Sequence, residues 1–228
     1  MAFKTKTDYF GIEDDAKIVC TSSSDGASHS VAEAKGEDGS VVAHEVYGAT
    51  IAPSCEYALK SAWGRGGEQP PNPIKLGGVT QTGDDKVALL NFSIGTSAGS
   101  APTVSASGEK VAGDGCTYSI PAFTIPKTHH AHILFDAFTL GGSGCHLTEA
   151  SYTASCGISK AEKEGVCLAH DVVEGKIEAS INIVQTGSAE PTVDPGDGWY
   201  LSSPLACTNP DADYPTWTAT LTKYLAKD

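Results

Sequence analysis

Two short motifs place a histidine beside a carboxylate, which is the pairing that orients a general base in many hydrolytic sites. They are Ala43-His44-Glu45-Val46 and Ala169-His170-Asp171-Val172. Both lie in stretches that alternate apolar and polar residues, and adjacent residues of a strand point to opposite faces of the sheet. Within one regular strand, neither histidine can therefore hydrogen-bond to the acid beside it. We interpret the two motifs as matching parts of the architecture.

A second histidine cluster has spacing that suits a metal ion. His130 and His132 are two positions apart in a strand predicted over His130–Leu140, so both imidazoles would project from one face. His146 follows a predicted turn and could return toward them. A metal-dependent enzyme using these three histidines is one hypothesis, and a polar strand edge is the alternative. The sequence specifies no further ligand, so we predict no cofactor.

The familiar catalytic and phosphate-binding motifs are absent from the sequence. It contains no G-x-S-x-G nucleophile elbow and no H-E-x-x-H zinc motif. The glycines at 64–67 are not followed by Lys-Ser or Lys-Thr, and the acidic pairs at 194–197 and 211–213 do not match a calcium loop. We predict that the protein is not an enzyme.

The elements that must position these residues are mostly strands. Ile177, Ala179, Ile181 and Ile183 alternate with polar residues, as expected for a half-buried strand. Further strands are predicted over 87–94, 116–125 and 214–225, and the segment 158–164 (ISKAEKE) is predicted to form a short helix. The fold class is therefore all-β, an antiparallel β-sandwich or barrel with one short helix, in a single domain over 1–228.

Composition and charge exclude several functions. The 228 residues carry a net charge of −13, which offers no basic stripe for binding nucleic acid. No apolar window is long enough for a transmembrane helix, and residues 1–15 lack the apolar core of a signal peptide. The seven cysteines, an odd number, favour reduced thiols over a disulfide framework.

An internal repeat is suggested by a second pair of matching segments. Residues 99–104 read GSAPTV and residues 187–193 read GSAEPTV, in the same order relative to the two histidine motifs. Repeat-like units at about 41–104 and 167–193 indicate duplication of a β unit, with chance similarity as the alternative. The first unit also contains a Gly- and Pro-rich stretch at about 62–78, which we predict to be a long exposed loop.

Taken together, several segments resemble the tail-tube proteins of tailed bacteriophages. The resemblance is carried by an N-terminal arm at 8–12 (DYFGI), the long loop, the Pro-Thr-Val edge turn and the run 165–187. It implies a structural virion protein, assembled in the host cytoplasm, whose copies form stacked hexameric rings. Two similar units per chain would instead allow a ring of three chains. The resulting acidic conduit passes DNA without binding it specifically.

The resemblance also implies partners and contact residues. The partners are further copies of the chain and other phage tail proteins, with no membrane. The N-terminal arm, the long loop and the C-terminal tail would make the contacts between rings; the candidates are Tyr9, Phe10, Trp63, Arg65, Pro70, Pro71 and Trp217. The alternative to a tail tube is a β-sandwich binding or adhesion module that uses Trp63 and Trp199 on its loops.

Overall fold

The computed structural model describes residues 7–12, 18–59, 76, 79–82, 85–97, 103–110, 127–129, 132–134, 137–163 and 166–225. Within these residues the chain is all-β. The strands are β1 (Ile18–Lys35), β2 (Val41–Leu59), β3 (Val79–Thr82), β4 (Asp85–Ser97), β5 (Thr103–Lys110), β6 (Lys127–His129), β7 (His132–Leu134), β8 (Phe138–Gly141), β9 (Cys145–Lys163), β10 (Val166–Gln185), β11 (Thr192–Pro195), β12 (Tyr200–Cys207) and β13 (Thr216–Tyr224).

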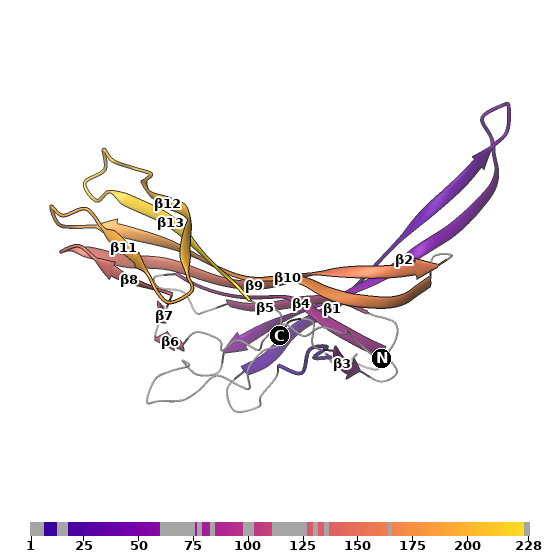
Figure 1. Cartoon of the computed structure of the whole chain (residues 1–228), viewed down its shortest axis with the longest axis horizontal. Helices are drawn as coiled ribbons and strands as arrows, with labels where there is room; N and C mark the ends of the chain where they lie inside the picture. Colours follow the sequence, from indigo (N-terminus) through magenta and orange to yellow (C-terminus); the bar gives the residue numbers. More distant parts are fainter. Residues whose placement is uncertain are drawn as a thin grey trace.

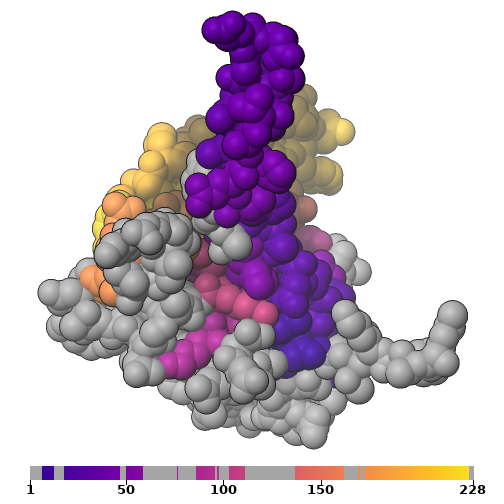
Figure 2. Space-filling model, turned by 90° about the vertical axis from the view of Figure 1, so that its right-hand side faces the viewer, coloured from indigo at the N-terminus to yellow at the C-terminus, as the bar shows by residue number. Residues whose placement is uncertain are grey.

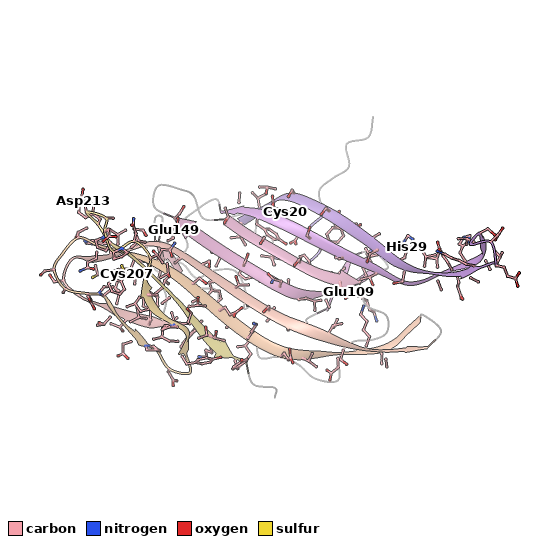
Figure 3. All side chains as sticks on the ribbon, turned by 90° about the horizontal axis from the view of Figure 1, so that it is seen from above. Cys20, His29, Glu109, Glu149, Cys207 and Asp213 are labelled. Carbon is pink, nitrogen blue, oxygen red and sulfur yellow. The ribbon has the colours of Figure 1, made fainter. Side chains whose placement is uncertain are left out.

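One large antiparallel sheet dominates the molecule (Figure 1). Eight of its nine strands follow the order β1-β2-β5-β4-β9-β10-β13-β12, and β3 pairs with β4 beside this path. Two small two-stranded sheets, β8–β11 and β6–β7, complete the fold. In the view from above, the long strands lie side by side from the indigo β1 to the yellow β12 (Figure 3). Within the described residues the sheet is not closed, because its path ends at β1 and β12.

The hydrophobic core lies against one face of this sheet. Phe92, Ile94, Ile181, Ile183 and Leu221 are each at most 1% exposed and come from its central strands. They share one face because side chains two positions apart in a strand point the same way. The predicted alternation over Ile177–Ile183 is therefore confirmed. Segments outside the long strands pack over this face, among them residues 10–12, Leu76, Phe138, Leu140 and Val193.

The N-terminal segment at 7–12 is tied to the first two strands. The Tyr57 hydroxyl donates a hydrogen bond to Asp8 Oδ1 at 2.6 Å, and the Tyr9 hydroxyl donates to Asp25 Oδ2 at 3.0 Å. The Cys55 thiol donates to the Thr7 carbonyl. These bonds hold Phe10, which is 7% exposed, against the core.

Two predictions about local structure are wrong. The stretch predicted as a helix over 158–164 forms the end of β9 as far as Lys163, because its residues pair with those of β10. The stretch 130–140 is not one strand: β7 pairs with β6, whereas β8 pairs with β11 in another sheet. The strand predicted over 116–125 lies outside the described residues, as does the predicted loop at 62–78 apart from the buried Leu76.

The bond between Tyr57 and Asp8 makes stability sensitive to alkaline pH. Burial, and secondly the hydrogen bond to Asp8, raise the pKa of Tyr57 well above its usual value near 10. The folded state therefore keeps a proton that the unfolded chain loses above pH 10, so its stability is full below pH 10 and falls as the pH rises further. The slope contributed by this one group approaches about 1.4 kcal/mol per pH unit.

We predict that Tyr57→Phe removes most of this alkaline loss, since phenylalanine cannot ionise. Urea unfolding at pH values from 8 to 11.5 measures the effect. In Tyr57→Phe the unfolding free energy should still fall somewhat with rising pH, because burial also raises the pKa of the Cys55 thiol. The control is Tyr214→Phe, because the Tyr214 side chain is 61% exposed. This variant should show the same dependence of unfolding free energy on pH as the wild type. Superimposable profiles for wild type and Tyr57→Phe would contradict this account.

Candidate functional site: a polar sheet face and two hairpin arms

The face of the large sheet opposite the core is lined by small polar side chains, and we call it the polar face. One row of directly paired residues crosses all eight strands of the path, from β1 to β12: Ser22, Glu56, Ser105, Ser93, Thr153, Glu178, Thr222 and Tyr200. Seven of these eight residues are Ser, Thr or Glu. Because each is polar while its strand neighbours are mostly buried and apolar, the sheet separates a core face from a hydrophilic one.

Hydrogen bonds between neighbouring strands tie the polar face together. Ser24 and Ser54 lie 2.8 Å apart through their hydroxyl oxygens, as do Ser93 and Ser105. The Ser22 hydroxyl donates to Glu56 Oε2 at 3.1 Å. Cross-strand pairs of this kind stabilise a sheet modestly and also use up donors that could otherwise bind a ligand. The polar face is therefore hydrophilic and carries carboxylates such as that of Glu56, and several of its hydroxyl groups are hydrogen-bonded to neighbouring side chains.

Two long hairpins extend beyond the body of the sheet. The first arm is residues 30–46, from β1 and β2, and the second arm is 157–172, from β9 and β10. Figure 3 shows both at the same end of the sheet, and Figure 2 shows the first arm standing clear of the rest. The first arm exposes four valines: Val31, Val41, Val42 and Val46 are 46–66% exposed. Apolar side chains on a projecting element are typical of contacts with another molecule.

The two histidine motifs occupy equivalent places in these arms. Ala43 pairs with Ala34, and Ala169 pairs with Ala161. His44 lies opposite Glu33, and His170 lies opposite Lys160. Each motif belongs to the second strand of its hairpin, and His44 is exposed on a two-stranded arm. Their repetition reflects matching hairpins.

The match extends along the full length of both hairpins. The register of β1 with β2 shifts between Cys20 and Ser22, between Ser28 and Ser30, and between Ala34 and Lys35. The register of β9 with β10 shifts at the corresponding three places, at a constant offset of 127 residues from β1 to β9 and 126 from β2 to β10. β-Bulges are specific features that bend a strand and fix its pairing. Because three bulges occur at equivalent positions, each residue of the first hairpin can be matched to one residue of the second.

A side-chain bond at one bulge is also the same in both hairpins. Thr21 is the extra residue of β1, and its hydroxyl donates to the Glu56 carbonyl at 3.1 Å. Thr148 is the extra residue of β9, and its hydroxyl donates to the Asn182 carbonyl at 3.2 Å. Each threonine thus stabilises the equivalent bulge of its hairpin by bonding to the equivalent residue of the neighbouring strand.

The remaining strands complete the correspondence. The path β1-β2-β5-β4 has the same connectivity as β9-β10-β13-β12. Residues 103–107 (TVSAS) of β5 pair with β2 as residues 216–220 (TWTAT) of β13 pair with β10. β4 and β12 share a register shift, after Leu89 and after Leu201. We call Ile18–Lys110 the first unit and Cys145–Tyr224 the second unit.

The sequence contains a signal for this correspondence that differs from the predicted one. Residues 102–107 read PTVSAS and residues 215–220 read PTWTAT, and these segments contain the first residues of the equivalent strands β5 and β13. The predicted match, GSAPTV with GSAEPTV, joins the β4–β5 connection to the β10–β11 connection. These connections are not equivalent in the sheet order, so the second unit continues to β13, beyond residue 193.

The predicted histidine cluster lies only partly within the described residues. Cross-strand pairing in the β6–β7 hairpin joins His129 to His132, and His130 lies outside the described residues. His146 is exposed at the start of β9. Among the described residues, no group of three His, Cys, Asp or Glu side chains is placed to hold a metal ion.

The predicted contact residues fall into three groups. Tyr9 packs on the core and bonds to Asp25, and Phe10 is buried. Trp217 is half-buried, and its indole N–H donates to Gln185 Oε1 at 3.0 Å. Trp63, Arg65, Pro70 and Pro71 lie outside the described residues. Trp199, a candidate for a binding loop, packs partly buried against the core and lies 6.2 Å from the Tyr152 ring.

No protein-family model and no curated protein matches the sequence. Within the described residues, the structure contains no helix with the length and apolar character needed to cross a membrane.

We predict that Thr21→Val and Thr148→Val each destabilise the protein, because each removes a hydroxyl bond that holds a bulge. The expected loss is about 0.5–1.5 kcal/mol, larger for the more buried Thr148. Urea unfolding measures both, with Thr139→Val on the exposed side of β8 as the control. A loss in neither variant would contradict the anchoring role given to these hydroxyls.

Proposed function

We propose that this protein is a self-assembling structural protein of a virion, whose copies close into rings that stack into a tail tube. The tube is an acidic conduit through which DNA passes without specific binding. The observation that carries the proposal is the open path of eight strands, buried on one face and polar on the other. A sheet of this kind serves as one segment of a larger barrel when several copies are joined.

The direction of the strands supports closure into a ring. Every neighbouring pair along the path is antiparallel, so β1 and β12, seven pairings apart, run in opposite directions. A copy rotated about a central axis can then continue the sheet as another antiparallel pair. An odd number of strands would have placed parallel strands at the joint. Closure also removes the exposed edges that make an open sheet prone to aggregation.

The two units set the number of copies in the ring. We infer that the chain arose by duplication of one four-stranded unit, since strand order, bulges and the threonine bonds are repeated. The ring of six units implied by the resemblance to tail-tube proteins then needs three chains of two units each. Eight strands spaced by about 4.8 Å and tilted by about 40° cover about 50 Å of circumference. Three chains therefore enclose a barrel about 50 Å across.

The polar face suits the lining of a DNA conduit. Carboxylates such as Glu56 and Glu149 repel phosphates, and hydroxyls bonded to one another offer few donors for backbone contacts. The chain's net charge of −13 is consistent with such a lining. The core face and its covering segments would form the outside wall.

Electron microscopy tests the proposal directly. We predict that the purified, concentrated protein forms rings or tubes with an open lumen in negative stain. Light scattering coupled to size exclusion should give masses that are multiples of three chains. A monodisperse monomer at every concentration tested would contradict assembly, and so would filaments without a lumen.

A charge reversal tests which face lines the lumen. We predict that Glu56→Lys with Glu149→Lys makes assembled tubes retain double-stranded DNA at 150 mM salt, whereas wild-type tubes do not. Both glutamates are exposed on the polar face. The control, Glu37→Lys with Glu190→Lys, makes the same charge change outside this face. Co-sedimentation with labelled DNA measures retention, and equal retention by the two variants would rule out the polar face as the lining.

A further inference from the structure

The junction between the two units shows how one unit joins the next within a chain. The last strand of the first unit, β4, pairs antiparallel with the first strand of the second unit, β9. The pairs include Ser93 with Thr153, Ile94 with Tyr152, and Gly95 with Ser151. Because the hairpins correspond residue by residue, and β4 matches β12 around Ile94 and Cys207, this junction can be translated to the edges of the sheet within the described residues, which are β1 and β12.

The translation uses the shared register. Tyr152 of β9 corresponds to Asp25 of β1, through the constant offset between the hairpins. Ile94 of β4 corresponds to Cys207 of β12, because Ile94 pairs with Val104 as Cys207 pairs with the equivalent Trp217. One position further along, Ser151 corresponds to Ser24, and Gly95 to Thr208, whose N–H donates to the Thr216 carbonyl.

We propose that β12 of one copy pairs with β1 of the next copy in the register of the β4–β9 junction. Asp25 of one copy then lies opposite Cys207 of the other, and Ser24 lies opposite Thr208. This inference rests on the proposed assembly and adds the identity and alignment of the strands at the joint. The partner is a second copy of the same chain.

The exposure of β1 supports this joint. At the positions of β1 that correspond to the buried Tyr152 and Ala154 of β9, the side chains of Asp25 and Ala27 are exposed. The difference arises because β9 has neighbours on both sides, whereas among the described strands β1 pairs only with β2. A neighbouring copy on β1 would give it the environment that β4 gives β9.

Cysteine placement makes the register testable with a single substitution. Cys207 is a free, half-buried thiol on β12. We predict that Asp25→Cys forms a disulfide with Cys207 of the next copy under mild oxidation in air with copper-phenanthroline. The Cu(II) complex passes the two electrons of the thiol pair to dissolved dioxygen, which also takes up the two thiol protons as hydrogen peroxide. Non-reducing electrophoresis should show a ladder that ends at three chains and collapses on reduction.

Matched controls separate register from simple proximity. Ser24→Cys sits one position away on the same edge but points to the opposite face, so it should not link to the native Cys207. Adding Cys207→Ser to Asp25→Cys should abolish the ladder. The Cα–Cα distance of directly opposed residues alternates along an antiparallel ladder between a wider and a closer value. Of the two neighbouring pairs, Asp25 with Cys207 and Ser24 with Thr208, one therefore has the closer distance. For this reason Ser24→Cys with Thr208→Cys is tested as a second cysteine pair.

The outcomes distinguish the joint from the assembly. A ladder from either opposed pair, with none from the controls, supports the proposed register. Rings in the microscope with no ladder from either pair would overturn this joint and leave the assembly standing. A ladder of equal intensity from Ser24→Cys with native Cys207 would overturn the register. A monomer without rings or ladder would overturn both.

Discussion

The architecture depends on the register between neighbouring strands. A slip of one residue moves every side chain of a strand to the other face, so an eight-stranded path with one buried face requires each register to be fixed. The bulges fix it here. At Thr21 the extra residue lets Cys20 and Tyr57 face the core while Ser22 and Glu56 face solvent. The hydroxyl of Thr21 stabilises that irregularity, and Thr148 does the same in the second hairpin.

The same constraint explains which features the two units share and which differ. Bulges and pairing partners are retained because they control the faces of the sheet. Side chains at equivalent positions follow their local environment, so Tyr152 is buried where Asp25 is exposed. β12 has one additional register shift, between Ser203 and Ala206 around Pro204, that β4 lacks. Proline cannot donate to a ladder, so pairing along this edge is interrupted there.

Much of the fold could be predicted from alternation alone. The period of two over Ile177–Ile183 identifies β10, and the apolar run within β4 identifies a buried strand. The helix predicted for the segment ISKAEKE is absent because lysine, glutamate and alanine favour helices in isolation, whereas pairing with β10 determines the structure of residues 158–163 in the protein. Single-sequence patterns do not contain that long-range pairing.

The site was harder to predict than the strands. The histidine motifs are conspicuous because histidine is rare, yet they mark only the matching arms. The polar face consists of Ser, Thr and Glu at alternate positions of many strands, and no local window distinguishes it from any solvated sheet face. The PTVSAS and PTWTAT segments contain the signal that β5 and β13 are equivalent strands. The match between 99–104 and 187–193 is no such signal, because Gly, Ser and Pro are common in turns and the two segments join strands that are not equivalent.

The polar face and the free edges place complementary demands on the chain. A conduit wall needs small, self-satisfied side chains, and such side chains bury little apolar surface to hold copies together. In the proposed assembly, cohesion between copies would come from backbone ladders at β1 and β12 and from apolar elements away from the wall. The first arm, which stands clear of the sheet in Figure 2, carries the exposed Val31, Val41, Val42 and Val46 and would be one such element. The proposal thus accounts for exposed valines on a chain whose sheet face is polar, because the wall would avoid adhesion and the arms would provide it.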